Sequence, residues 1–289
     1  KYKPIILNPI LDRKDTTIFS EISKYFKKNN AEKAFSAIKD TIDALRLSET
    51  RLFGKASKPN CKFSQWQVLQ LLLLFPCFMV RNAYNYVSSP LSKIAECHKD
   101  VFYRFLSNED YDWRKIQYHI SRQLWDKIQR RRKKSDKTPV CLIFDDSDYP
   151  KSGKSTEMIG KVFSHVHSKM ILGFKALFCA ITDGKSQMLL DEAIVGEKGK
   201  NENYGMKPSD LLHRFSKERK EGCAVEQRKK EYDTSKITLM IEMIKRVIKR
   251  RIHFDYVLAD DEQTVLDLLI NRSEKLNYFI DFYKAKVSA

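Results

Sequence analysis

The sequence predicts an α/β protein with an N-terminal helical domain, residues 1–135, followed by a domain built on a mixed sheet, residues 136–289. Two observations carry this prediction. Apolar residues recur at spacings of three and four up to about residue 132, which is typical of helices, and short continuous apolar runs follow, which are typical of buried strands. The change falls at a basic run, residues 130–134, and at Pro139, so we place the domain boundary there.

The composition indicates a folded protein with a polyanionic partner. The 289 residues carry a net charge of +17 and include 42% hydrophobic residues, which is enough for a core and excludes a disordered chain. Such basic charge favours nucleic acid as the partner, with an acidic membrane surface as the weaker alternative. The longest apolar run, residues 68–80, is shorter than the about 20 residues of a membrane-spanning helix. With no targeting segment visible, we expect a cytoplasmic protein without a membrane partner.

Helical periodicity recurs throughout the first domain. The helix that contains Trp66 should end at Pro76, because proline lacks the amide that continues a helix. The longest helix begins near Trp113 and runs into the basic segment before the domain boundary. The predicted helices lie around residues 19–26, 34–45, 66–75, 100–106 and 113–132.

The second domain opens with strands. Residues 140–144 form a continuous apolar run, typical of a strand buried on both faces, and the run stops abruptly at Asp145 and Asp146. The residues Asp183 and Gly184 form a turn signal between the last two strands of this region. The further strands are predicted at residues 157–166, 170–182 and 187–195.

A basic segment, residues 196–232, separates these strands from the last elements, and we interpret it as an exposed insertion. Thr234 or Ser235 then caps a helix whose apolar stripe runs from Ile237 to Ile248 and whose last turns are basic. The predicted order ends with a strand at 254–259, a helix at 264–270 and a strand at 278–283.

Two apolar strands, far apart in the sequence, end in carboxylates. The first ends at Asp145 and Asp146, and the second ends at Asp260. If the strands are neighbours in one sheet, these carboxylates meet, and their hard oxygen ligands suit Mg²⁺ or Mn²⁺ in phosphoryl transfer. Two such ions about 4 Å apart would activate the attacking oxygen and stabilise the leaving one. The alternative is that the acids only mark the places where strands reach the surface.

The order of elements is the order expected of an RNase H-like sheet, with a carboxylate on the opening strand and another after the crossover helix. The sequence also resembles a known family, the insertion-sequence transposases of the DDE type, and most closely the group named for insertion sequence four. The resemblance covers roughly residues 16–260 and rests on the segments 82–86, 101–106, 112–115, 145–154, 171–175, 181–186 and 254–260.

This resemblance assigns roles to two residues. It implies that Asp146 is the first catalytic aspartate, with Asp145 as a lesser candidate, and that Asp260 is the second. Both would bind the two Mg²⁺ or Mn²⁺ ions that drive phosphodiester hydrolysis and strand transfer. The implied partners are double-stranded DNA, at the element ends and at the target, and a second copy in a homodimer. The expected location is the bacterial cytoplasm, at the nucleoid when bound to DNA.

The sequence departs from this family after Asp260. The family places a third carboxylate in the pattern Tyr-x2-Arg-x3-Glu-x6-Lys on a later helix, and Glu262 and Glu274 lack that context. We therefore expect an RNase H-like domain without its last helix, truncated and catalytically incomplete. Two other hypotheses stay open, a non-catalytic DNA-binding remnant of a transposase and an RNase H-like nuclease.

Several basic residues are candidates for contacts with DNA phosphate, which would position the DNA without reading its sequence. Lys151 and Lys154 lie on a turn near the first aspartate. The same turn resembles half of a phosphate-binding P-loop, but Asp148 stands where that motif needs glycine, so we set an NTPase aside. The candidates are Arg104, Arg114, Lys115, Arg130, Arg131, Arg132, Lys151 and Lys154.

Overall fold

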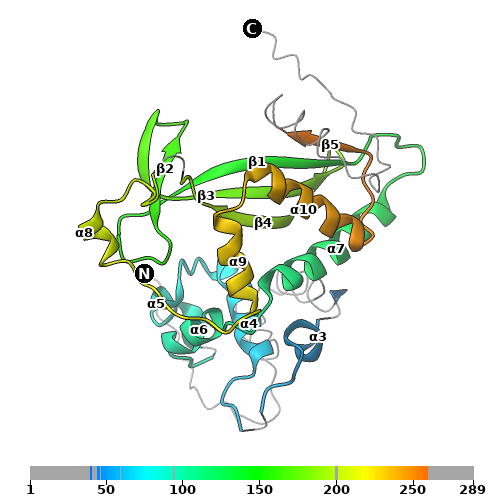
Figure 1. Cartoon of the computed structure of the whole chain (residues 1–289). Coiled ribbons are helices and arrows are strands. Elements are labelled where there is room, and N and C mark those ends of the chain that lie inside the picture. Colours follow the sequence, from blue (N-terminus) through cyan, green and yellow to red (C-terminus); the bar gives the residue numbers. More distant parts are fainter. Residues whose placement is uncertain are drawn as a thin grey trace, which may run out of the picture. The chain divides into compact units, whose positions relative to one another are not determined.

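The computed structural model describes residues 40, 44, 45, 47–58, 60–93, 95–198 and 201–259. The chain forms two compact units that divide between Tyr111 and Asp112. The first is a helical unit and the second is a sheet unit, each shown in Figure 1. Three predicted elements, the helix around 19–26, the helix at 264–270 and the strand at 278–283, lie outside the described residues, as does most of the helix at 34–45.

The helical unit contains short helices that begin at polar caps. In α4, Ser64 and Gln67 form a reciprocal capping box, and the helix ends at Leu74, just before Pro76, as predicted. The predicted helix at 100–106 is α6. The elements of this unit are α3 (Glu49–Phe53), α4 (Gln65–Leu74), η1 (Pro76–Phe78), α5 (Ala83–Tyr86), η2 (Pro90–Lys93) and α6 (Lys99–Leu106).

Aromatic side chains form the core of the helical unit. The ring of Tyr86 contacts those of Phe75 and Phe102, at centroid distances of 5.7 and 4.7 Å, and these two rings contact each other at 5.2 Å. The Tyr86 side chain is fully buried, and its hydroxyl donates a hydrogen bond to the carbonyl of Ala95. A buried tyrosine that finds a polar partner is stabilising, so this part of the unit has a specific core despite its short helices.

Within its described residues, the sheet unit contains five strands whose order agrees with the predicted class. The strand β1 pairs antiparallel with β3 and parallel with β5, and β3 also pairs antiparallel with β2 and with β4. This mixed sheet with helices confirms the α/β class, and its order is that of an RNase H-like domain. The strands are β1 (Cys141–Pro150), β2 (Gly160–Ser164), β3 (Lys169–Thr182), β4 (Gln187–Val195) and β5 (Tyr256–Ala259).

The first strand is longer than its apolar run. We predicted that it stops at Asp145, but β1 continues to Pro150, because β3 pairs with it over its whole length. Asp145 and Asp146 therefore lie in the middle of β1 and not at its end. They do come directly after the part that pairs with β5, whose last pair is Phe144 and Ala259.

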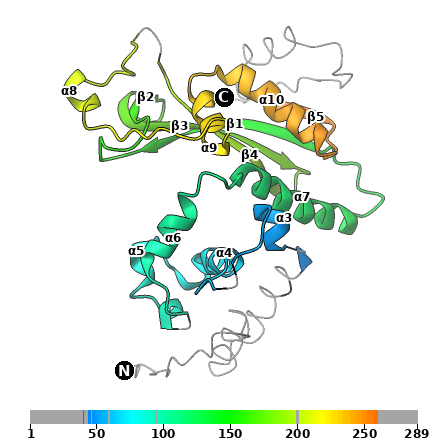
Figure 2. The same ribbon diagram turned by 60° about the horizontal axis from the view of Figure 1, so that its bottom comes forward.

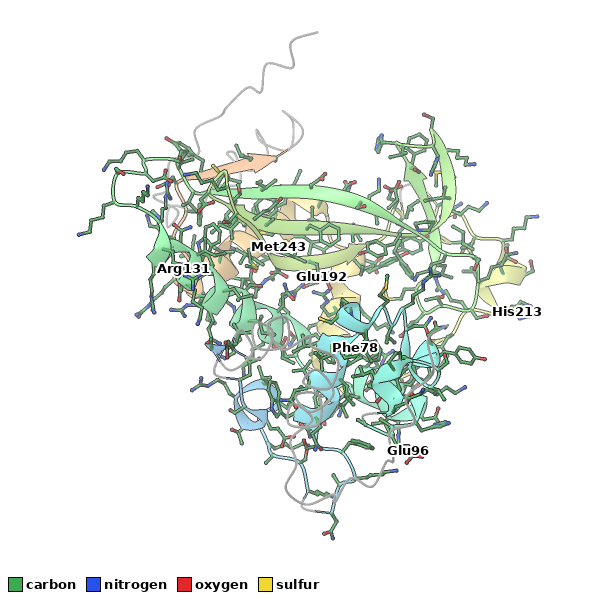
Figure 3. The ribbon with its side chains drawn as sticks, turned by 180° about the vertical axis from the view of Figure 1, so that it is seen from behind. Phe78, Glu96, Arg131, Glu192, His213 and Met243 are labelled. Atoms are coloured by element: carbon green, nitrogen blue, oxygen red, sulfur yellow. The ribbon has the colours of Figure 1, made fainter. Side chains whose placement is uncertain are left out.

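Two helices supply most of the core of the sheet unit. The helices α7 (Trp113–Arg131) and α10 (Lys236–Lys249) are labelled in Figure 2. The helix α7 contributes Tyr118 and Trp125, and α10 contributes a stripe that includes the fully buried Met243, which is labelled in Figure 3. Ser235 is the N-cap of α10, as predicted. The two units divide before α7 and not near residue 135, because α7 belongs to this core. No helix in the described part of the chain is both long and apolar enough to span a bilayer.

The segment predicted as an exposed insertion, residues 196–232, contains structure of its own. It includes α8 (Pro208–Leu211) and α9 (Ala224–Tyr232). Tyr232 is 3% exposed, and its carbonyl accepts a hydrogen bond from the amide of Gly196. A Cβ atom on Gly196 would lie 2.3 Å from the Tyr232 ring, so only glycine permits this packing. The interpretation as insertion thus holds for the exposed residues but not for α9.

Candidate active site

The first strand carries two acidic side chains on its core-facing side. Side chains alternate along a strand, so Asp146 and Asp148 continue the face that begins with the buried Leu142 and Phe144. Asp145 lies on the opposite face, exposed, and its carboxylate accepts a hydrogen bond from the amide of Asp146. Of the two neighbouring aspartates, Asp146 is therefore the one directed toward the interior of the domain.

A buried lysine faces these carboxylates. Lys175 of β3 is paired in register with Asp148 and is only 1% exposed. Its ammonium donates to the carbonyl of Phe163 and lies 3.0 Å from a carboxylate oxygen of Glu197. It also lies 3.8 Å from Oδ1 of both Asp146 and Asp148. Buried charges need such partners, and here three carboxylates surround one ammonium.

Lys175 keeps its charge because of these neighbours. Burial by itself would lower the pKa of Lys175, but the hydrogen bond with Glu197 and the charges of Asp146, Glu197 and Asp148 outweigh it. The pKa is therefore raised above its ordinary value, and Lys175 stays an ammonium ion. The site is thus held together by charge and not by apolar packing.

A second lysine contacts Asp146 from α10. Lys236, the first residue of that helix, donates a hydrogen bond to Oδ2 of Asp146. The Lys236 side chain is 36% exposed and that of Asp146 is 30% exposed, so this ion pair lies at the rim of the domain. We refer to Asp146, Asp148, Lys175, Glu197 and Lys236 as the lysine–carboxylate cluster.

The strand β5 pairs in parallel with β1 and ends one residue before the second predicted aspartate in the sequence. The start of the β1–β5 pairing is fixed by Asp255, whose carboxylate accepts from the amide of Val140 and whose amide donates to the carbonyl of Val140. The pairing ends at Phe144 and Ala259, one residue before Asp260 in the sequence. Asp260 itself lies outside the described residues.

The donor atoms of the cluster suit a divalent cation. Asp146 and Asp148 present hard carboxylate oxygens on one face, which is the chemistry that Mg²⁺ and Mn²⁺ require. Within the described residues, no three His, Cys, Asp or Glu side chains come together as a set that could hold a metal ion. Asp146 would thus hold an ion together with ligands that these residues do not supply.

Most of the basic candidates lie on exposed surface. Arg104, Lys115, Arg130, Arg131 and Lys151 are exposed, and so is Lys154, whose ammonium lies 2.8 Å from Asp210. The end of α7 carries Arg131 into a surface hollow of about 610 Å³. The walls of this hollow include Arg131, Arg132, Lys133, Lys185, Asp136 and Asp183.

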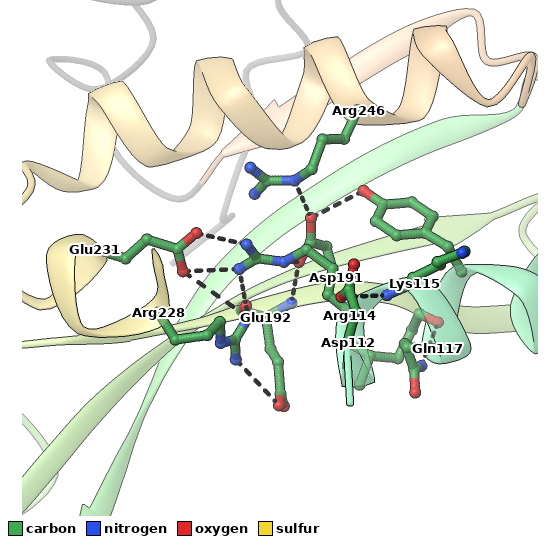
Figure 4. Close-up of polar contacts among 11 residues, drawn as sticks. Asp112, Arg114, Lys115, Gln117, Asp191, Glu192, Arg228, Glu231 and Arg246 are labelled. Carbon is green, nitrogen blue, oxygen red and sulfur yellow. Dashed lines mark hydrogen bonds and ion pairs between the residues drawn. The ribbon is translucent and has the colours of Figure 1, made fainter. Parts of the chain in front are cut away.

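Arg114 has a different environment from the one we predicted. Its side chain is only 14% exposed, and its guanidinium contacts Asp191 at 2.7 Å and makes two hydrogen bonds to Glu231 (Figure 4). The nitrogen that donates to Oε2 of Glu231 also donates to the carbonyl of Glu192. Because these bonds use donors on all three guanidinium nitrogens inside the sheet unit, Arg114 holds α7, β4 and α9 together.

Asp191 is the centre of this network. Its side chain is fully buried and accepts hydrogen bonds from Arg114, from Arg246 of α10 and from the Tyr118 hydroxyl. Burial raises the pKa of Tyr118, and the charge of Asp191 raises it further. Two cations and a phenol thus compensate one buried carboxylate, as such a charge requires.

The structure departs from the sequence predictions at three further basic residues. Arg132, another predicted phosphate contact, instead donates to Asp136 and to the carbonyl of Thr138. The sequence analysis also missed Lys175 and Lys236 as partners of Asp146. Lys175 had a usable signal, since a lysine inside an otherwise apolar strand is almost never fully buried without a charged partner.

The sequence model of a family described as DDE superfamily endonuclease matches residues 88–263, more than half of the 289-residue chain. The chain belongs to this family. As a DDE superfamily endonuclease it has a nuclease or transposase type of function, acts on DNA and belongs to enzymes that generally use divalent metal ions. Asp146, the cluster around it and Asp260 all fall inside the matched region. No curated protein matches the chain.

Proposed function

We propose that the protein is the transposase of a bacterial insertion sequence, which cleaves phosphodiester bonds at the element ends and joins them to target DNA. The observation that supports this proposal most directly is the parallel pairing of β1 with β5. This pairing ends at Phe144 and Ala259. In the sequence, Asp146 lies two residues after Phe144, and Asp260 directly follows Ala259. Its partners in this proposal are double-stranded DNA at the nucleoid and a second copy of the chain.

Asp146 and Asp260 would hold the divalent ions, which when bound would polarise the phosphate and activate water. Asp146 is suited to this role because its position is fixed by β1 and its carboxylate reaches the rim of the domain. The exposed basic residues, Arg104, Lys115, Arg130, Arg131, Lys151 and Lys154, would bind the DNA backbone by charge. Arg114 and Arg132 are left out of this set, because their donors are used within the domain.

The pattern that carries the family's third carboxylate does not follow Asp260 in this sequence, so any nicking of DNA should be slow. The test measures Mn²⁺-dependent nicking of supercoiled DNA, over long incubations, by the full chain and by two variants. Asp146→Asn should lose nicking by at least about a hundredfold, because a neutral amide is a poor ligand for a hard cation. Asp145→Asn is the matched control, since that carboxylate lies on the other face of β1, and it should retain activity. Nicking by the unchanged chain that Asp146→Asn retains in full would contradict the proposal.

Two other outcomes would select the competing hypotheses. Specific binding to an inverted repeat without any nicking would indicate a non-catalytic DNA-binding remnant. Nicking that needs Asp146 but shows neither end preference nor joining would indicate a nuclease of the same fold. The DNA-joining assay and the binding assay therefore use the same protein and the same repeat-containing DNA.

A further inference from the structure

Two lysines contact the same carboxylate in the lysine–carboxylate cluster, but they are held very differently. Lys175 is 1% exposed, donates to the carbonyl of Phe163 and lies between the carboxylates of Glu197, Asp148 and Asp146. Lys236 is 36% exposed and, among the described residues, its only recorded partner is Asp146. The Lys175 ammonium is therefore fixed in place, whereas the Lys236 ammonium can move away from Asp146.

The two lysines also occupy different oxygens of Asp146. Lys175 lies 3.8 Å from Oδ1, whereas Lys236 bonds to Oδ2. Lys175 is shared with two other carboxylates, so it neutralises Asp146 only in part. The oxygen that faces the rim of the domain is the one that Lys236 covers, and a cation that approaches from solvent meets the ammonium first.

The backbone next to Lys236 is anchored. Lys236 follows the N-cap Ser235, whose hydroxyl accepts from the amide of Thr238, and α10 then packs its apolar stripe into the core. Departure of the ammonium from Asp146 therefore needs only rotations within its four-carbon stem. It needs no movement of α10.

We propose that Lys236 is a placeholder cation, which occupies the cation position at Oδ2 of Asp146 and is released when a divalent ion binds there. Lys175 stays and positions the carboxylates of Asp146, Asp148 and Glu197. This inference rests on the proposed function, because it takes Asp146 as a metal ligand. Lys236 is thus a positioning residue that keeps Asp146 compensated before the ion arrives, and it competes with the ion for that carboxylate.

The test measures binding of Mn²⁺ to the full chain by electron paramagnetic resonance, without any DNA. Lys236→Gln removes the competing charge and should bind Mn²⁺ about fivefold more tightly, which corresponds to the usual strength of a partly exposed ion pair. Lys236→Arg keeps the charge and should bind Mn²⁺ no more tightly than the unchanged chain. Lys245→Gln, on the same helix but paired with Glu242, is the matched control and should not change the affinity.

A second readout is thermal unfolding. Without metal, Lys236→Gln leaves Oδ2 of Asp146 without its cation, so its Tm should fall relative to Lys245→Gln. Added Mn²⁺ should raise the Tm of Lys236→Gln more than that of the unchanged chain, because the ion then supplies the missing charge.

The outcomes separate this inference from the proposed function. If Asp146→Asn binds Mn²⁺ as well as the unchanged chain does, the proposed function fails. If Mn²⁺ binding needs Asp146 but Lys236→Gln binds the ion equally well or more weakly, the proposed function stands and the placeholder role is refuted. Weaker binding would mean that Lys236 supports the metal site instead of competing for it.

Discussion

At the scale of single residues, the role of a charged side chain depends more on its partners of opposite charge than on its exposed fraction. Lys175 and Asp191 are both at most 1% exposed, yet each is surrounded by opposite charges from other elements. Buried ion pairs stabilise little compared with apolar packing, but removal of one partner is costly because the other is left uncompensated. A substitution at either position should therefore lower the stability of the fold mainly through the buried charge of the partner that it leaves uncompensated.

Arg114→Ala tests this view. The change leaves Asp191 with Arg246 and Tyr118, and leaves Glu231 without its two guanidinium bonds, so unfolding free energy should fall by about 3 kcal/mol. Urea unfolding followed by circular dichroism measures this loss. Arg122→Ala, on the same helix with a 47% exposed side chain, should cost no more than about 0.5 kcal/mol.

The same variant separates a structural role from a DNA contact. Under conditions where Arg114→Ala is folded, its affinity for DNA should equal that of the unchanged chain, because the guanidinium donors were never available to phosphate. A large loss of DNA binding by the folded variant would show that Arg114 does reach the DNA.

At the scale of elements, the turn between β3 and β4 depends on one carboxylate. Asp183 is 6% exposed and accepts from the amides of Lys185 and Ser186 and from the Gln129 side chain of α7. Burial would raise the pKa of Asp183, but these hydrogen bonds outweigh it and the pKa is lowered from 3.8. The ionised carboxylate therefore holds both the turn and the neighbouring helix.

This lowered pKa gives a pH dependence of defined sign. A carboxyl whose folded pKa lies below its unfolded value stabilises the fold fully above the unfolded pKa, and this stabilisation is lost as the pH falls through the folded pKa. Asp183→Asn should therefore be less stable than the unchanged chain by about 1 kcal/mol at pH 7, and the difference should shrink below pH 4. Urea unfolding at both pH values measures it, and Asp126→Asn, exposed on α7, should show no difference at either.

The bounds of a helix or strand can be predicted from the sequence when they are set by residues that are close together in the chain. The helices α4, α6, α7 and α10 and the strands β3 and β4 begin and end within a few residues of the predicted bounds, because caps and periodicity are local. The end of β1 was predicted wrongly, since the apolar run stops at Asp145 while the pairing with β3 continues. The acids in mid-strand are tolerated here because Asp145 is exposed and because Lys175, from the neighbouring strand β3, faces Asp146 and Asp148.

The candidate site was predictable only in part, for the same reason. The carboxylates could be found because acids directly after apolar runs stand out in the sequence. The partner of Asp148 could not, because it depends on the register that places Lys175 opposite this residue. The interpretation of Arg114 as a phosphate contact overlooked partners 77 and 117 residues further along the chain, which no local pattern predicts.

At the scale of the whole molecule, the net charge of +17 should make the affinity for DNA fall steeply as the salt concentration rises. Arg130 and Arg131 are exposed at the end of α7, so each should release about one counterion on binding DNA. The double change to alanine should reduce the slope of log affinity against log salt concentration by about 2, measured by fluorescence anisotropy.

The control for this experiment removes two lysines whose charge is already paired. Lys230 and Lys245 lie 2.9 and 2.8 Å from Glu226 and Glu242. Their double change to alanine should leave the salt slope within about 0.5 of the original value. Equal losses of slope in both double variants would mean that total charge, and not the end of α7, sets the affinity.

The network around Asp191 also has a consequence for the order in which the chain folds. Its members come from α7, β4, α9 and α10 (Figure 4). The Asp191 carboxylate of β4 gains its compensation only when both α7 and α10 are in place, and α9 adds Glu231, which binds Arg114. Contacts between segments so far apart in the chain form late, after the cost of closing the intervening loops. The network should therefore contribute little to the folding transition state, and its loss should mainly accelerate unfolding. Its stabilising effect is then kinetic as well: it lengthens the lifetime of the folded sheet unit rather than hastening its formation.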